Sequence, residues 1–174
     1  ELSTPEEMQI AGDWYHFAIL SLAKTQAFQD RPSWISRRLG ISLREATSSL
    51  RLLKKLGFLV KAPSGRWTPT HVNGLTSGTG SLNAARRKHN LENLELARRC
   101  IHEIALEFRD FSHITFATDP KKIKLAKSLI QKFRMEFSEM MESVEKTEVF
   151  KLMIGLLPLT QNQNFGIKKG NNDA

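Results

Sequence analysis

The sequence predicts an α+β fold, mainly helical, in which a winged helix-turn-helix precedes two long helices with a small β-sheet (strand–helix–strand). Two observations support it: residues 1–70 hold three short helical patterns and a hairpin pattern, and residues 84–160 alternate long helical patterns with strand-like segments. The uncharged, glycine-containing stretch 71–83 between them is expected to be a linker. The tail 161–174 has no core-forming pattern, and we expect it to be mobile.

The first two helices of residues 1–70 have recognisable boundaries. Asp13 is suited to an N-cap, and apolar residues follow it at helical spacing as far as Ala23. Pro32 begins a shorter helix. Gly40 ends that helix, because glycine adopts the left-handed C-cap conformation at little cost.

The third helix begins with the sequence of a capping box. Ser42 is followed three residues later by Glu45, and the helical pattern ends near Leu56. We expect the apolar residues of this helix to form one buried stripe, made of Leu43, Ala46, Leu50 and Leu53.

A β-hairpin is predicted directly after the third helix. Residues 58–61 and 66–68 have strand character, and the Pro- and Gly-containing sequence 62–65 supplies the turn between them. Three helices followed by a hairpin, with a short Gly turn before the capped helix, are typical of a winged helix-turn-helix.

Positive charge is concentrated in residues 31–70. This segment has nine Lys and Arg against the single Glu45, a net charge of +8 that equals the formal charge of the whole chain. Such a concentration favours an anionic partner, most commonly nucleic acid, although a solvated basic surface without a partner is the alternative. A second basic run, residues 86–88, lies near the start of a predicted helix, where its charge opposes the helix dipole and so indicates a separate role.

The third helix occupies the position of a DNA-recognition helix, and its outward face is rich in donors. Recognition helices read bases with their N-terminal half, and Arg can contact a guanine edge with two hydrogen bonds. The predicted interface with double-stranded DNA comprises Arg44, Thr47, Ser48 and Arg51 near the bases, and Lys54, Lys55, Lys61 and Arg66 near phosphates. The alternative is a winged helix that contacts another protein, with its charges merely solvated.

Residues 84–160 alternate between helix and strand patterns. The pattern is helical over 84–108, alternates as in a strand over 111–118, and becomes helical again after Asp119 and Pro120. Residues 148–157 are apolar at nearly every position, as in a strand covered on both faces.

The second long helix and the last strand together predict a homodimer. The helix carries an apolar heptad seam, most of which we expect to pack within the chain: Ile123, Ala126, Ile130, Phe133, Phe137, Met140 and Val144. Two strands are too few for a stable sheet, and a second copy of the chain is the most economical way to complete it.

Catalytic, metal and membrane functions have little support. The five His residues are scattered without metal-ligand spacing, Cys100 is the single cysteine, and no nucleophile or phosphate-binding motif is present. We therefore expect neither an enzyme nor a bound cofactor or metal. The absence of a membrane-length apolar run and of a signal peptide, with only one cysteine, predicts a cytoplasmic protein that does not bind membranes.

Four separate motifs resemble an uncharacterised bacterial family of predicted transcription regulators. They are Asp13-Trp-Tyr-His-Phe-Ala-Ile, Pro32-Ser-Trp-Ile-Ser-Arg-Arg-Leu-Gly-Ile-Ser42, Arg109-Asp-Phe-Ser112 and Leu156-Leu-Pro-Leu-Thr160. Members pair an N-terminal helix-turn-helix with a C-terminal domain of unknown function, number 4423, and this chain resembles the C-terminal domain over residues 10–160. The resemblance implies a preceding helix-turn-helix module, which would explain a chain that begins with Glu1, and it supplies no catalytic or ligand residues.

The sequence therefore predicts the C-terminal part of a transcription regulator that binds DNA. Two alternatives remain open: a protein-interaction or dimerisation module whose winged helix does not contact DNA, and a small-molecule sensor with a pocket between the long helices and the strands.

Overall fold

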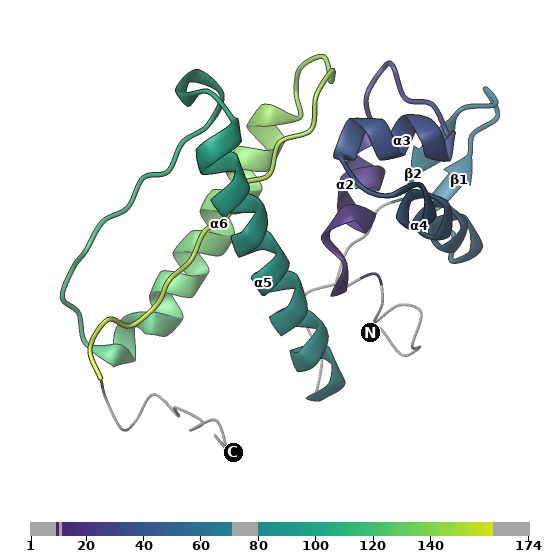
Figure 1. Cartoon of the computed structure of the whole chain (residues 1–174). Coiled ribbons are helices and arrows are strands. Elements are labelled where there is room, and N and C mark those ends of the chain that lie inside the picture. The colour runs from purple at the N-terminus through teal and green to yellow at the C-terminus, as the bar shows by residue number, and fades with distance from the viewer. Residues whose placement is uncertain (1–9, 11, 71–79, 162–174) are drawn as a thin grey trace.

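The first half of the chain forms three helices and a two-stranded hairpin, in the predicted order (Figure 1). The computed structural model describes residues 10, 12–70 and 80–161. The elements of this half are α2 (Trp14–Leu22), α3 (Pro32–Leu39), α4 (Leu43–Lys55), β1 (Leu59–Lys61) and β2 (Trp67–Pro69). Most of the predicted linker, residues 71–79, and nearly all of the predicted tail, residues 162–174, lie outside the described residues.

The sequence signals that separate α3 from α4 have the expected geometry. Gly40 has φ 64° and ψ 30°, the left-handed conformation that ends α3. The Ser42 hydroxyl accepts a hydrogen bond from the Glu45 amide at 3.2 Å, and the Glu45 carboxylate accepts one from the Ser42 amide at 2.8 Å. This confirms the capping box and fixes where α4 begins.

The hairpin is antiparallel, with Val60 opposite Thr68. Its turn is closed by a 2.8 Å hydrogen bond from the Ala62 amide to the Arg66 carbonyl, and Gly65 has φ 81°. The predicted strands and turn are confirmed, with the second strand displaced by one residue.

All the buried apolar side chains among the described residues lie in the first half. Leu43 is an exception to the predicted stripe of α4: it is the first residue of the helix and is 57% exposed. The core comprises Ile10, Ile19, Leu20, Leu22, Ala23, Ile35, Ala46, Leu50, Leu53 and Leu59.

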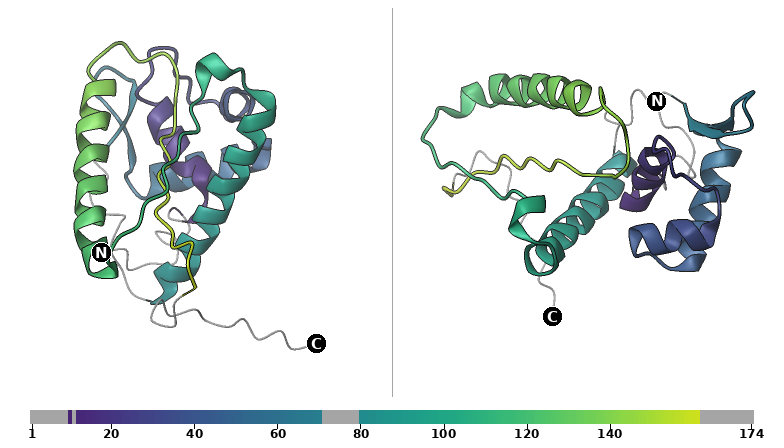
Figure 2. Two further views of the ribbon diagram at one scale, coloured as in Figure 1. Left: turned by 90° about the vertical axis from the view of Figure 1, so that its left-hand side faces the viewer. Right: turned by 90° about the horizontal axis from the view of Figure 1, so that it is seen from above.

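The second half is built from two long helices, α5 (Gly80–Glu103) and α6 (Ile123–Met141), which diverge rather than pack along their lengths (Figure 2). The helix predicted over 84–108 ends early. Ala105 has ψ 149°, which is not helical. Arg109 Nε donates a 2.7 Å hydrogen bond to the Ile104 carbonyl, one of the carbonyls after α5 that has no partner within the helix. A short 3-10 turn (Leu106–Phe108) follows, and another (Pro120–Lys122) leads into α6.

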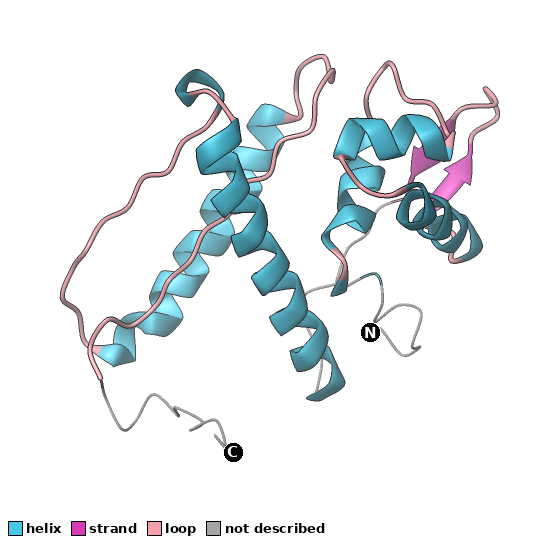
Figure 3. Ribbon diagram, in the orientation of Figure 1, coloured by secondary structure: helices cyan, strands magenta, loops and turns pink. Residues whose placement is uncertain are grey.

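The two predicted strands of the second half are wrong for the single chain. Residues 111–118 and 148–157 are drawn as loop in Figure 3, and between described residues neither segment makes a backbone–backbone hydrogen bond. A strand requires a neighbouring edge, and within the described part of the chain nothing supplies one.

The predicted packing of most of the α6 seam within the chain is also wrong. Ile123, Ala126 and Ile130 are half-buried, whereas Phe133 is 50% exposed and Met140 is 67% exposed. The seam stays exposed because the predicted sheet that would have covered it does not form in the single chain. The fold is thus α+β and mostly helical, with one two-stranded sheet among the described residues.

Several polar contacts join the second half to the first. Lys24 pairs with Glu142 at 2.8 Å and Arg38 with Glu148 at 2.7 Å, and the Gln26 amide donates to the Lys146 carbonyl at 3.1 Å. Among the residues that the structure describes, no helix combines the length and apolar character needed to cross a bilayer.

Leu53 and Leu43 provide a matched test of which face of α4 is buried. Leu53→Ala should lower the free energy of unfolding by about 2–5 kcal/mol, because Leu53 is fully buried and its removal leaves a cavity. Leu43→Ala should change it by less than about 1 kcal/mol. The three Trp residues of the chain lie at 14, 34 and 67, so denaturation followed by Trp fluorescence reports on this half. Equal effects of the two changes would contradict the exposed position of Leu43.

Candidate nucleic-acid interface

The outer face of α4 is a row of exposed polar side chains. Arg44, Ser48, Arg51 and Lys55 are all exposed and are spaced i, i+4, i+7 and i+11, so they lie along one side of the helix. The opposite side carries the buried part of the stripe, Ala46, Leu50 and Leu53. Because the buried side cannot rotate away from the core, the four polar side chains are held facing solvent; we call these four residues the α4 face.

The two hydroxyl residues of the predicted interface bond to their own helix. Thr47 Oγ1 donates to the Leu43 carbonyl at 2.7 Å, and Ser48 Oγ donates to the Glu45 carbonyl at 3.1 Å. Thr47 is half-buried at the edge of the α4 face. Each hydroxyl oxygen still has acceptor capacity, so these groups are suited to accept rather than to donate further hydrogen bonds.

Two of the predicted phosphate contacts are used inside the protein. Lys54 Nζ pairs with Asp30 at 3.0 Å and lies 3.9 Å from the centroid of the Trp67 ring. Arg66 donates to the Thr25 carbonyl. These contacts tie the hairpin to the helices, so Lys54 and Arg66 are less available to an external ligand than the sequence suggested.

The remaining two predicted phosphate contacts, Lys55 and Lys61, are exposed. The structure thus brings Arg44, Ser48, Arg51 and Lys55 together on one face, with Thr47 at its edge and Lys61 on the hairpin. Lys54 and Arg66 instead make contacts within the first half, with Asp30, Trp67 and Thr25.

Behind α4 lies a buried polar cluster that sequence reasoning missed. His16 Nδ1 and Ser49 Oγ are 2.6 Å apart, and both residues are almost fully buried. His16 Nε2 is 3.5 Å from Asp13 Oδ2, which also accepts a hydrogen bond from the Tyr15 hydroxyl at 3.2 Å. The cluster therefore joins the start of α2 to the buried side of α4. Asp13 occupies the predicted N-cap position, but its carboxylate makes these contacts instead of a cap hydrogen bond.

Helix α5 is attached to this cluster. Lys88 Nζ pairs with Asp13 Oδ1, and the Trp14 amide donates to Glu92 Oε2 at 3.0 Å. The hydrogen bond with Asp13 raises the pKa of Lys88. The basic run at 86–88, unfavourable to the α5 dipole, thus includes a lysine that neutralises a buried carboxylate of the first half.

Burial governs the protonation of this region. Burial lowers the pKa of His16, although the neighbouring Asp13 acts in the opposite direction. Burial also lowers the pKa of His89, whose ring packs edge-on against Phe17, and Lys151 adds to that shift. Burial, followed by the Asp13 carboxylate, raises the pKa of Tyr15. We therefore expect both histidines to be neutral at pH 7.

The arrangement of Asp13, His16 and Ser49 is not suited to nucleophilic catalysis. A nucleophilic serine must reach its substrate, but Ser49 has no exposed surface. Among the described residues, no group of three or more His, Cys, Asp or Glu side chains is placed to hold a metal ion. The cluster is a structural connection between helices. A polar His within the apolar run of α2 was the one sequence signal that could have revealed it.

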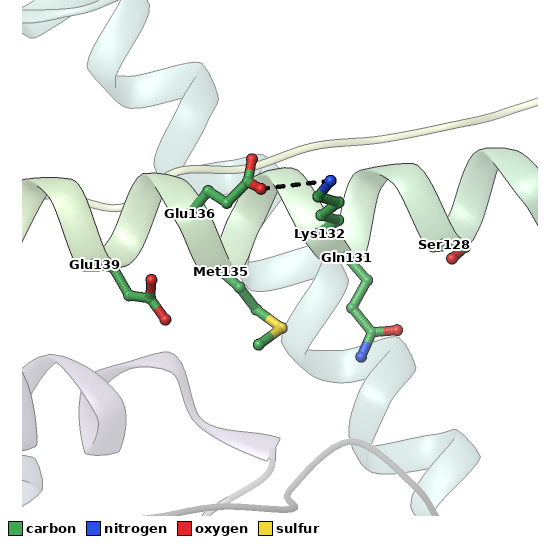
Figure 4. A pocket seen from close by; sticks show the side chains of 6 residues that line it. All are labelled: Ser128, Gln131, Lys132, Met135, Glu136 and Glu139. Atoms are coloured by element: carbon green, nitrogen blue, oxygen red, sulfur yellow. Dashed lines mark ion pairs between the residues drawn. The ribbon is translucent and has the colours of Figure 1, made fainter.

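A shallow hollow on α6 gives little basis for a small-molecule site. All of its lining residues come from this one helix, and they have polar or flexible side chains: Ser128, Gln131, Lys132, Met135, Glu136 and Glu139 (Figure 4). Ligand pockets are normally concave and walled by several elements, so this surface would leave a ligand in contact with solvent.

Comparison with known proteins identifies a family. The model of the family described as domain of unknown function DUF4423 matches residues 1–159, which includes both halves of the chain. No curated protein and no solved structure matches the chain.

His16 should make stability depend on pH. Its pKa is lowered by folding from an ordinary value of 6.5, so between the two values the unfolded chain binds more protons than the folded chain. The free energy of unfolding should therefore fall as the pH drops through 6.5. Denaturation followed by Trp fluorescence from pH 7.5 to pH 5 measures this slope.

In the variant His16→Asn, position 16 no longer titrates. The free energy of unfolding should then change less steeply with pH, and the remaining dependence should include a contribution from His89. An unchanged slope in His16→Asn would show that His16 is not the titrating group.

Proposed function

The chain belongs to the family defined by the domain of unknown function DUF4423, and we propose that it is a DNA-binding part of a cytoplasmic transcription regulator. In this proposal the first half is a winged helix-turn-helix, with α3 and α4 as its helix pair and the β1–β2 hairpin as its wing. The resemblance of the chain to predicted regulators, in which a further helix-turn-helix precedes this domain, supports a role as the C-terminal part of a longer protein.

The α4 face is the observation on which the proposal rests. It presents three cationic side chains and one hydroxyl on a helix whose opposite side is locked into the core. A helix of this kind, placed after a short helix and a Gly turn, has the position and width to enter a major groove.

The positions along α4 assign different roles to these residues. Arg44, Thr47 and Ser48 lie in the N-terminal half of α4, which approaches base edges when a recognition helix enters the major groove, and Arg51 follows just past the middle of the helix. Lys55, at the end of α4, would lie near phosphates, as would Lys61 on the hairpin. Phosphate contacts give affinity and orientation, and base contacts give sequence preference.

A protein-interaction module is the second candidate function, and a specific observation favours it. Lys54 and Arg66 are used in intramolecular contacts, which reduces the charge available for phosphates. In that case the winged helix would be a scaffold within an assembly and would not contact DNA.

We also propose that the regulator is a homodimer. Helix-turn-helix proteins commonly bind two half-sites related by a two-fold axis, so two copies of the α4 face would contact successive turns of one DNA face. The apolar surface of the second half is suited to hold the copies together.

Charge reversal on α4 tests DNA binding directly. The double change Arg44→Glu with Arg51→Glu should abolish binding to a DNA fragment that the parent chain binds, because two favourable contacts become repulsive. The control Lys121→Glu with Lys122→Glu alters the net charge by the same amount on an exposed turn of the second half, and it should retain most of the binding. Retained binding in the α4 variant, or no binding by the parent chain, would favour the protein-interaction module.

Salt dependence separates Lys55 from its neighbour Lys54. Lys55→Ala should flatten the slope of log affinity against log salt by about 0.9, the effect of losing one phosphate contact. Lys54→Ala should leave this slope nearly unchanged and instead lower stability, since Lys54 pairs with Asp30 and covers Trp67. Affinity measured at several salt concentrations gives both slopes. A larger slope change in Lys54→Ala than in Lys55→Ala would reverse the assignment.

A further inference from the structure

Exposed apolar side chains are concentrated in the second half of the chain. Of the 26 large apolar residues that are exposed among the described residues, 24 lie between Leu91 and Leu159, whereas every buried apolar residue lies between Ile10 and Leu59. The exposed set comes from α5, α6 and both segments that link or follow them. We call this set the 91–159 surface.

The 91–159 surface exposes enough apolar area for a protein interface. Its six Phe residues are 37–75% exposed, and with about 200 Å² for each side chain they alone expose roughly 600 Å². A standard protein interface buries about 800 Å² on each partner. The other apolar residues of the set bring the total well above what a stable dimer needs.

Unpaired backbone lies in the same region. Residues 110–118 and 148–159 run without helix or strand, and between described residues they make no backbone–backbone hydrogen bond (Figure 3). Arg109 and Asp119, which border the first of these segments, have the extended dihedrals of strand residues. Both segments have the apolar content of strands, with Ile114 84% exposed and Phe150 75% exposed.

We infer that a second copy of this chain covers the 91–159 surface, and that residues 110–118 and 148–159 become strands of a β-sheet built by both copies. This deepens the homodimer of the proposed function and does not depend on DNA binding. This would reconcile the sequence with the fold of the single chain. The two segments have the sequence pattern of strands, and the second copy would supply the neighbouring strand edge that the single chain lacks.

A second copy fits this surface better than an unrelated partner. The occupant must provide both apolar area and strand edges, and another copy brings the same two segments with the same composition. The surface extends over nearly the whole second half, so a transient partner would leave it in water between encounters. Obligate interfaces of this size are typical of homodimers, whose partner is produced together with the chain.

The test uses the full chain without DNA. Sedimentation at micromolar concentration should give twice the monomer mass. Amide hydrogen exchange should show protection within 110–118 and 148–159, because paired amides exchange only when the sheet opens. In an isolated monomer these amides would exchange freely.

Ile114→Lys tests the interface with a matched control. If Ile114 is buried between copies, the change should raise the dimer dissociation constant about a hundredfold or more, because each dimer loses two buried apolar side chains. Val60→Lys makes the same type of change at an exposed β-branched residue of the hairpin and should leave the dissociation constant unchanged. Trp fluorescence shows whether the first half remains folded in both variants.

Each outcome bears on the inference. A parent chain that stays monomeric, or a dimer with freely exchanging amides in both segments, overturns it, as does an unchanged dissociation constant in Ile114→Lys. None of these measurements involves DNA, so failure of DNA binding in the charge-reversal experiment would leave this result intact.

Discussion

The burial of one side of α4 is the contact on which the rest of the structure depends. Ala46, Leu50 and Leu53 are the part of the core that α4 contributes, and they meet residues of α2, α3 and β1. Full burial of such side chains contributes about 1.5–3 kcal/mol for each large residue. The same contact determines which side chains of α4 face solvent, so the stability of the first half and the orientation of the α4 face have one cause.

The buried polar cluster adds directional constraints to this apolar contact. Hydrophobic packing alone would tolerate small rotations of α4, whereas the hydrogen bond between His16 and Ser49 requires one alignment of two helices. Asp13 then connects the cluster to Lys88 of α5. The arrangement of α2, α4 and α5 is therefore held by buried polar contacts, although His16 Nε2 makes no hydrogen bond with the described residues.

The elements that were predictable from sequence are those whose signals are local. Gly40 ends a helix through its own backbone freedom, and Ser42 and Glu45 cap a helix within four residues, so both were read correctly. The exposed residues of α4 followed from helical periodicity. The cluster of Asp13, His16 and Ser49 was not predictable, because its members are brought together by packing between α2 and α4. The internal contacts of Lys54 and Arg66 were missed for the same reason. The strands predicted at 111–118 and 148–157 were wrong for a different reason: strand composition is a local signal, whereas strand pairing needs a neighbouring edge that the described part of the chain does not provide.

The two halves of the chain are held together by contacts of a different kind from those within the first half. The pairs Lys24–Glu142 and Arg38–Glu148 have partly exposed side chains, and such pairs contribute about 0.2–1 kcal/mol each and weaken as salt increases. At the contact between α5 and the cluster, the Asp13 side chain is only 10% exposed, whereas that of Lys88 is 57% exposed. The buried carboxylate makes this contact less sensitive to salt than the two pairs above. A surface that joins two copies through the second half would therefore place the α4 faces mainly through α5, Lys88 and Asp13. The pair between Arg38 of α3 and Glu148 gives a second connection between the second half and the helices that hold α4.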